Sequence, residues 1–179
     1  GPWPGGEAEW PTEPWFDPEL LAAGDTRNVI DRYRYWRMDA IVADLDTKRH
    51  PFHVAIENWQ HDMNIGSIVR SANAFLADTV HIIGRRRWNK RGAMVTDRYQ
   101  HVVHHEDVAT FVAWASAEGL PVIAVDNVEG AVPVDTALDG LRPPGPVVGL
   151  GVAAIVTFAI AFSPPIDDSF GSRGLQEHH

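Results

Sequence analysis

The 179-residue sequence contains no cysteine, so disulfides, thiolate metal sites and cysteine nucleophiles are all excluded. That composition is compatible with a reducing, cytoplasmic compartment. The sequence also contains no Ser/His/Asp nucleophile elbow and no phosphate-binding P-loop, which argues against hydrolysis and nucleotide phosphate transfer. Residues 1–26 contain six acidic residues and no lysine or arginine, and so lack the charged start of a secretory signal. We expect residues 1–25 to form a disordered or extended tail.

The length and the share of apolar residues fit one folded domain with appendages. A chain of 179 residues, 45% of them hydrophobic, can bury one core but is short for two. We expect a helical extension over residues 26–50, the folded domain over residues 51–162 and a C-terminal tail over residues 163–179. The end of that tail, Glu177-His178-His179, looks like the remnant of an affinity tag.

The net charge of −9 is unevenly distributed along the chain. Residues 27–98 contain 13 of the 15 basic residues and eight acidic residues, a local charge of +5. Residues 99–179 contain two basic and ten acidic residues, a local charge of −8. Binding to a polyanion depends on a local basic surface more than on the total charge. The acidic total therefore does not exclude an RNA partner.

Short apolar runs alternate with helical periodicity after residue 50. Buried strands are predicted over residues 53–56, 79–83, 121–125 and 146–150. Apolar residues recur at helical spacing over residues 65–76 and 108–115, which predicts two helices between the strands. This alternation is typical of an α/β fold with a parallel sheet flanked by helices.

Upstream of the first strand, Asp25 or Thr26 can cap a helix that continues towards Leu45. Arginines alternate with aromatic residues along this segment. Its aromatic stripe can pack on the core with the arginines in solvent, or the arginines can contact RNA.

The segment Asp62-Met63-Asn64-Ile65-Gly66 is a strand-to-helix turn in which polar residues can cap the helix. Gly66 lets another backbone or a ligand come close. Arg70 lies near the end of the second helical turn, off the apolar stripe. An arginine near a helix N-terminus at the carboxyl end of a parallel sheet can hold a phosphate with two hydrogen bonds. From these residues alone, an ordinary capped helix with a surface arginine remains the alternative.

Three stretches together resemble the first motif of the SpoU/TrmH family of ribose 2′-O-methyltransferases. They are His53-Val-Ala-Ile-Glu-Asn58, Asn64-Ile-Gly66-Ser-Ile-Val-Arg70-Ser-Ala72-Asn73-Ala-Phe75 and Val80-His-Ile-Ile-Gly84. A looser resemblance continues through the basic loop Arg85 to Arg98 and the strand Val122 to Asn127, so that it covers roughly residues 50 to 150.

The resemblance implies a SPOUT-type domain with a trefoil knot, S-adenosylmethionine as methyl donor, tRNA or rRNA as substrate, and a homodimer. Asn64 and Arg70 match polar residues of the motif, and the arginine is the one that the family associates with catalysis. Guanidinium stays protonated in proteins, so we expect Arg70 to clamp the adjacent phosphate and stabilise the developing alkoxide rather than act as a base. By their positions at strand ends, the residues expected to edge the donor pocket are Asp126, Asn127, Val148, Gly149 and Leu150.

A basic loop follows the predicted strand 79–83. Around the single aromatic residue Trp88 it contains Arg85, Arg86, Arg87, Lys90 and Arg91. This composition suits phosphate contact combined with base stacking, so we expect these residues to bind RNA. A solvated surface loop is the alternative.

After residue 149 the sequence departs from the family pattern. The motifs Phe-Gly-x-Glu-x-x-Gly and Ser-x-Asn-Val-x-Val-Ala, which in the family form the donor pocket and the knotted loop, do not appear in standard form. An RNA-binding protein of the same family without methyl transfer is therefore an alternative. Another is an NAD-dependent oxidoreductase, because Gly149-Leu-Gly151-Val-Ala-Ala154 followed by Asp167 and Asp168 fits a dinucleotide-binding pattern. Against it, Ser163-Pro164-Pro165 breaks the chain where a second parallel strand is required.

Residues 146–162 form an apolar segment in which Thr157 is the only polar residue. The segment is short for a membrane span and has no flanking basic residues, so we expect a buried strand followed by a core or dimer-interface helix, and no membrane partner. His101, His104 and His105 lack the spacing of a recognised zinc motif, and no metal is expected.

Overall fold

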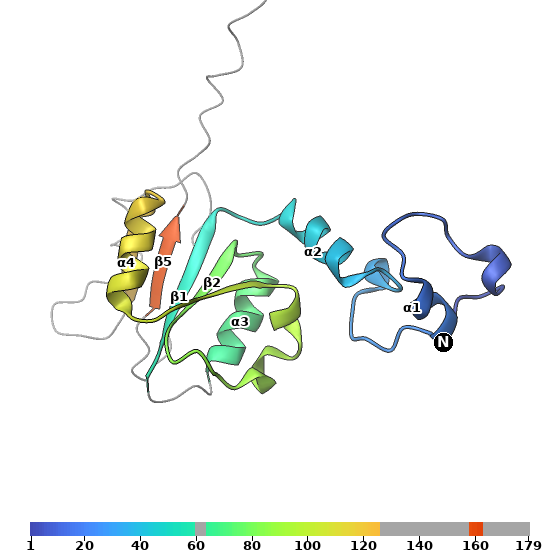
Figure 1. Cartoon of the computed structure of the whole chain (residues 1–179), viewed down its shortest axis with the longest axis horizontal. Coiled ribbons are helices and arrows are strands. Elements are labelled where there is room, and N and C mark those ends of the chain that lie inside the picture. The colour runs from blue at the N-terminus through green and yellow to red at the C-terminus, as the bar shows by residue number, and fades with distance from the viewer. Residues whose placement is uncertain (60–63, 126–157, 163–179) are drawn as a thin grey trace, which may run out of the picture.

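The computed structural model describes residues 1–59, 64–125 and 158–162 (Figure 1). The strand expected over residues 146–150 and the tail expected over residues 163–179 lie outside the described residues. So do the positions expected to edge the donor pocket, Asp126, Asn127, Val148, Gly149 and Leu150.

The described residues contain a five-stranded sheet in the order β3-β2-β1-β5-β4. Its strands are β1 (Phe52–Asn58), β2 (Thr79–Gly84), β3 (His101–His105), β4 (Val122–Val125) and β5 (Phe158–Phe162). Strands β1, β2 and β3 are parallel neighbours, whereas β5 is antiparallel to both β1 and β4. The prediction of an α/β fold with parallel strands flanked by helices is confirmed for β1 to β3, but the five-stranded sheet of the described residues is mixed.

Strand β5 corrects one expectation. Residues 151–162 were expected to form a helix, yet Phe158–Phe162 pairs with β1 on one side and β4 on the other. A short apolar run does not distinguish a buried helix from a buried strand, and here the two neighbouring strands satisfy its backbone groups. A helix following the glycine pattern of the oxidoreductase alternative likewise does not extend over Phe158–Phe162, where the chain forms an antiparallel strand.

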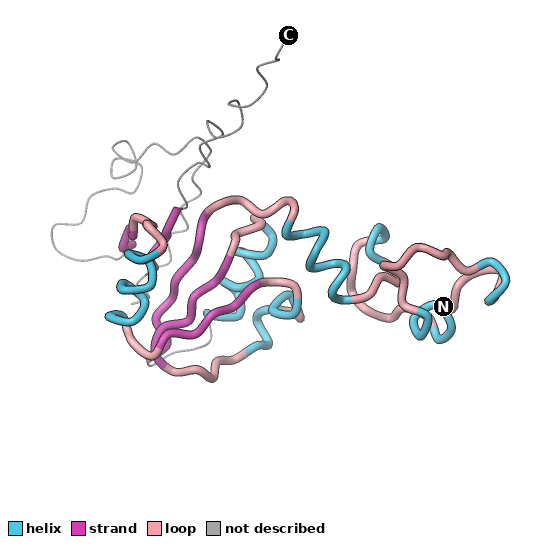
Figure 2. Tube along the Cα trace, turned by 45° about the horizontal axis from the view of Figure 1, so that its top comes forward, coloured by secondary structure: helices cyan, strands magenta, loops and turns pink. Residues whose placement is uncertain are grey.

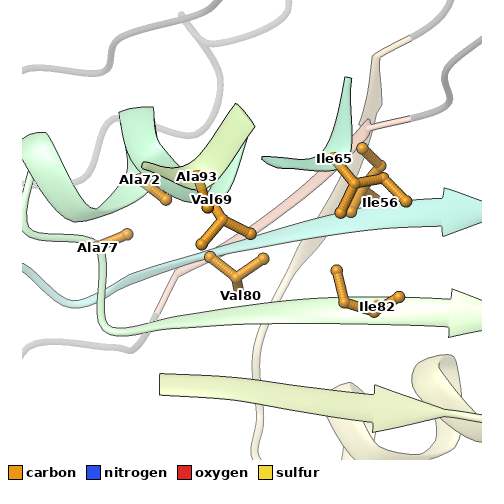
Figure 3. Close-up of a cluster of buried hydrophobic side chains, with 8 residues drawn as sticks. All are labelled: Ile56, Ile65, Val69, Ala72, Ala77, Val80, Ile82 and Ala93. Carbon is orange, nitrogen blue, oxygen red and sulfur yellow. The ribbon is translucent and has the colours of Figure 1, made fainter. Parts of the chain in front are cut away.

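Helices α3 (Ile65–Ala74) and α4 (Val108–Ala117) cover opposite faces of the sheet, as Figure 1 shows. Both helices were predicted from their periodicity. The larger core lies under α3 and is shown in Figure 3. It consists of Ile56, Ile65, Val69, Ala72, Ala77, Val80, Ile82 and Ala93. On the other face, Phe111 of α4 packs on Ala55 and Ile83. Alternate residues of β1 and β2 thus pack into the cores on the two faces of the sheet, as expected of strands buried on both sides.

The N-terminal residues form short helices and turns rather than the single long helix expected from Asp25 or Thr26 towards Leu45. The α-helices are α1 (Pro18–Ala23) and α2 (Met38–Asp46). Helix α1 lies within the segment expected to be a disordered or extended tail, and the Asp17 side chain caps it by accepting from the amides of Glu19 and Leu20.

The long helix is interrupted because the buried carboxylate of Asp25 organises a loop instead. It accepts hydrogen bonds from the amide of Tyr35 (2.9 Å) and from the amide and guanidinium of Arg27. Tyr35 has a positive φ of 63°, which a helix does not permit. The Arg27 side chain holds the pKa of the Asp25 carboxyl well below its usual range.

Helix α2 joins this N-terminal region to the sheet (Figure 2). At the junction the Arg49 side chain is 4% exposed and donates to the carbonyls of Ala77 (3.1 Å) and Tyr99 (2.6 Å) and to the Gln100 side chain (3.0 Å). The junction is therefore a set of buried hydrogen bonds and not a free linker. No helix in the described part of the chain has the length and apolar composition that crossing a membrane requires.

Candidate RNA-binding and catalytic site

Asn64 and Arg70 lie on one element, at the beginning and in the middle of α3. Asn64 is the residue preceding the helix; its carbonyl accepts from the amide of Ile68 (3.0 Å), and its side chain makes no capping hydrogen bond. Both side chains are exposed. The expectation that the Asn64 side chain could cap the helix is therefore wrong.

The first turn of α3 contacts the backbone of the basic loop directly. A Cβ added at Gly66 would lie 2.7 Å from the amide nitrogen of Ala93 and 2.9 Å from the carbonyl oxygen of Asn89. Gly92 on the other side would place a Cβ 3.0 Å from the amide nitrogen of Ser67. The sequence left open whether a backbone or a ligand approaches Gly66, and in the structure it is the backbone of the basic loop. Two glycines thus let the basic loop pack against the segment that carries Asn64 and Arg70.

The start of the basic loop is held by Asn58, the last residue of β1. Its side chain is 2% exposed and donates two hydrogen bonds, to the carbonyls of Arg85 (2.6 Å) and Arg87 (2.9 Å). The Arg85 amide in turn donates to the carbonyl of Asn58 (3.0 Å). Asn58 belongs to the motif quoted above but was not predicted as a site residue, because its partners are main-chain groups that no sequence pattern identifies.

The five basic residues predicted to bind RNA, Arg85, Arg86, Arg87, Lys90 and Arg91, are all exposed. Lys90 pairs with Asp97 (2.8 Å), and its ammonium lies 5.5 Å from the centre of the Trp88 ring. None of the other four, nor Arg70, takes part in an ion pair within the described residues. Their positive charge is therefore not neutralised by the described carboxylates.

A pocket of about 250 Å³ opens between the basic loop and the ends of β2 and β3. It is lined by Ile82, Arg86, Trp88, Lys90, Asp97, Val102 and His104. Trp88 is half-buried and packs against the core under α3, so it forms a wall of the pocket rather than standing free in solvent. Asp97 and His104 were not predicted for the site, because they come from a later turn and an unpredicted strand.

A family model described as "SpoU rRNA Methylase family" matches residues 51–149. The chain belongs to the SpoU rRNA methylase family. No curated protein and no solved structure shows significant similarity to it. In this SpoU-family chain the match includes β1, α3, the basic loop and β4, and ends where the sequence departs from the family pattern. The N-terminal residues 1–50 lie outside the match.

The opposite face of the SpoU-family sheet holds a chain of three buried histidines. His53 Nδ1 lies 3.1 Å from His81 Nε2, and His81 Nδ1 lies 2.8 Å from His105 Nε2. Trp114 of α4 covers them, with its ring centre 4.3 Å from that of His81. Burial lowers the pKa of all three, that of His81 to about 3. Burial therefore favours the neutral form of the three rings.

His101, His104 and His105, which are close together in the sequence, have separate partners in the structure. His101 pairs with Asp46 (2.8 Å), His104 lies 2.7 Å from the carbonyl of Gly84, and His105 belongs to the buried chain. Among the described residues, no group of three or more histidine and acidic side chains is placed to hold a metal ion.

Proposed function

We propose that this SpoU-family protein is an RNA ribose 2′-O-methyltransferase that uses S-adenosylmethionine and acts on tRNA or rRNA. Membership of an RNA methylase family supports the RNA methyltransferase class. The observation that carries the finer proposal is the backbone contact at Gly66 and Gly92, which joins the helix bearing Arg70 to the exposed arginines of the basic loop. A phosphate bound by that loop lies next to the helix that carries the catalytic candidate.

In this proposal Arg70 acts as a positioning and charge-stabilising group. Its guanidinium can grip a phosphate with two hydrogen bonds, which aligns the neighbouring ribose hydroxyl. The same positive charge favours the developing alkoxide as the hydroxyl loses its proton. Asn64 is proposed to hold the ribose or phosphate through its exposed amide. S-adenosylmethionine, when bound, supplies an electrophilic methyl group.

The donor side is proposed from sequence alone. Asp126, Asn127, Val148, Gly149 and Leu150 are the residues proposed to edge the donor pocket, and they lie outside the described residues. The trefoil knot, the homodimer and a cytoplasmic location also belong to the proposal. The knot and the homodimer are proposed from the family, and the cytoplasmic location is proposed from the absence of cysteine. No contact among the described residues bears on these three properties.

The test is transfer of a radiolabelled methyl group from S-adenosylmethionine to unmodified tRNA and rRNA transcripts. A 2′-O-methyl group is identified by the resistance of the adjacent phosphodiester to alkali. Arg70→Ala should lower kcat about 100-fold or more, the size of effect expected for loss of a charge-stabilising donor. Arg70→Lys should restore part of it. Val112→Ala, at an exposed position of α4 on the opposite face of the sheet from α3, is the control and should keep the wild-type kcat.

Near-normal turnover of Arg70→Ala would exclude the proposed role of Arg70. A second candidate function, RNA binding without methyl transfer, is favoured by the absence of the standard donor motifs after residue 149. Calorimetry with S-adenosylmethionine separates the two candidates. A folded protein that binds RNA but releases no heat with S-adenosylmethionine would support the second one.

A further inference from the structure

We infer that the pocket between the basic loop and strands β2 and β3 receives a nucleobase of the bound RNA. The inference rests on the proposed RNA substrate and adds a base-binding site to the phosphate contacts. The volume of about 250 Å³ is below the range typical of sites for drug-sized ligands, and suits a single heteroaromatic ring system.

The lining has the two components that recognise a base. Ile82 and Val102, from adjacent strands, supply an apolar floor, and the half-buried Trp88 supplies an aromatic wall. Single-stranded RNA is recognised by unstacked bases that are placed against aromatic side chains and hydrogen-bonded along their edges. An apolar and aromatic surface beside exposed arginines is therefore more than a phosphate site requires.

The polar groups of the pocket include both donors and acceptors. Arg86 and Lys90 donate, and the Asp97 carboxylate, whose side chain is 11% exposed, accepts. His104 Nε2 lies 2.7 Å from the Gly84 carbonyl and must carry a proton to donate to it. In the neutral ring Nδ1 is then an acceptor. A base edge carries donors and acceptors together, whereas an ionised phosphate only accepts and needs donors alone.

The pocket is also held in shape before any ligand binds. Asn58 fixes the loop at Arg85 and Arg87, and the Gly66 and Gly92 contact fixes it at the other end. Beyond the second of these contacts, Met94 and Val95 both adopt a left-handed backbone, with φ of 50° and 73°. This conformation is uncommon for residues other than glycine, and it turns the chain so that Asp97 meets Lys90.

The experiment blocks the pocket without touching the basic residues. Val102 and Val103 are adjacent, exposed residues of the edge strand β3, and only Val102 lines the pocket. Val102→Trp fills it, and Val103→Trp places the same side chain on the other face of the strand as a matched control. The probes are AMP, GMP, CMP and UMP, compared with ribose 5-phosphate, which has no base. Binding is measured by calorimetry at fixed salt.

We expect at least one of the four nucleotides to bind about tenfold more tightly than ribose 5-phosphate, as one base contact with an aromatic wall provides. Val102→Trp should remove this difference and leave ribose 5-phosphate binding unchanged, and Val103→Trp should preserve it. Equal binding of all five probes to the wild type, or a difference that survives in Val102→Trp, overturns the inference.

Failure of the pocket is distinguishable from failure of the proposed function. The affinity for a short single-stranded RNA is measured against salt, with and without abasic positions. A steep salt dependence with no preference for the RNA containing bases keeps phosphate binding and removes the base site. An RNA that does not bind at low salt in either form removes the proposed function itself.

Discussion

The side-chain amide of Asn58 links the sheet to the basic loop. It ends a buried parallel strand, where an apolar residue is the ordinary choice, and is 2% exposed. Its two donated hydrogen bonds satisfy the carbonyls of Arg85 and Arg87. Because those two carbonyls flank Arg86, one side chain fixes the backbone on both sides of that residue, over three consecutive arginines.

Replacing Asn58 by alanine should destabilise the protein and loosen the loop. The change removes both hydrogen bonds and leaves two carbonyls without their partner, which costs about 1–3 kcal/mol in the free energy of unfolding. Urea denaturation measures that loss. Limited trypsin digestion should cleave faster after Arg85, Arg86 or Arg87 than in the wild type, because the anchored backbone is released.

Asn73→Ala is the control for this experiment. The Asn73 side-chain oxygen is buried without a hydrogen-bond partner within the described residues, so its removal should change the free energy of unfolding little. If Asn58→Ala were as stable and as resistant to trypsin as Asn73→Ala, the anchoring role of Asn58 would be wrong.

The contact between α3 and the short 3-10 helix Lys90–Ala93 is made at backbone distance. Helices normally pack through side chains, with axes separated by about 8–10 Å. Here Gly66 and Gly92 face each other, and main-chain atoms occupy the space that a methyl group would fill. The position of the basic loop relative to Arg70 therefore depends on the absence of two side chains.

Gly66→Ala should separate these two elements. Alanine favours a helix by about 1 kcal/mol over glycine, yet the new Cβ would lie 2.7 Å from the Ala93 nitrogen, which must move with its backbone. We expect a net destabilisation of about 1–3 kcal/mol in urea denaturation, as for other overpacked sites. The affinity for RNA should fall at the same time, because the loop arginines shift relative to Arg70.

Ala113→Gly, at an exposed interior position of α4, isolates the propensity contribution and should cost about 1 kcal/mol without weakening RNA binding. A Gly66→Ala protein that is more stable than the wild type would show that the loop accommodates the methyl group, and the close contact would then have no role.

The sequence predicted those elements whose signal is local. The stripe at Ile65, Val69 and Ala72 predicted α3, and apolar runs predicted β1, β2 and β4. Strand β3 was missed because three of its five residues are histidines, and β5 was taken for part of a helix because its apolar run fits both. Both depend on their neighbours in the sheet, which no short window contains.

The residues of the candidate site also fall into two groups, those predicted from the sequence and those that only the structure identifies. Asn64, Arg70 and the five basic residues were found from a motif and from composition, and they do lie on two elements in contact. The anchoring role of Asn58 and the pocket positions of Asp97 and His104 arise from main-chain carbonyls, a left-handed turn and strand register. These features depend on contacts between residues far apart in the sequence, and only the structure identifies them.

The distribution of charge divides the chain into an acidic beginning, a basic middle and an acidic end. In the N-terminal region the opposite charges are paired locally, as in Asp25 with Arg27 and Asp44 with Arg32. The arginines of the basic loop differ from these, since none of them is paired with a described carboxylate. Long-range attraction of RNA is therefore expected from the loop despite the net charge of −9.

The three buried histidines should also make the stability of the protein depend on pH. His81 has a folded pKa of about 3 against 6.5 when unfolded, so below pH 6.5 the unfolded chain binds a proton that the folded chain does not. The free energy of unfolding should therefore fall by about 2 kcal/mol between pH 7 and pH 5 from His81 alone, and further from His53 and His105, whose pKa values are also lowered. Urea denaturation at both pH values measures this loss.

His81→Gln should reduce the pH dependence of the free energy of unfolding, whereas His50→Gln, at an exposed histidine, should retain it. An unfolding free energy that is equal at pH 7 and pH 5 would mean that the three rings are protonated in the folded protein, and that the chain of neutral histidines across β1, β2 and β3 does not exist in solution.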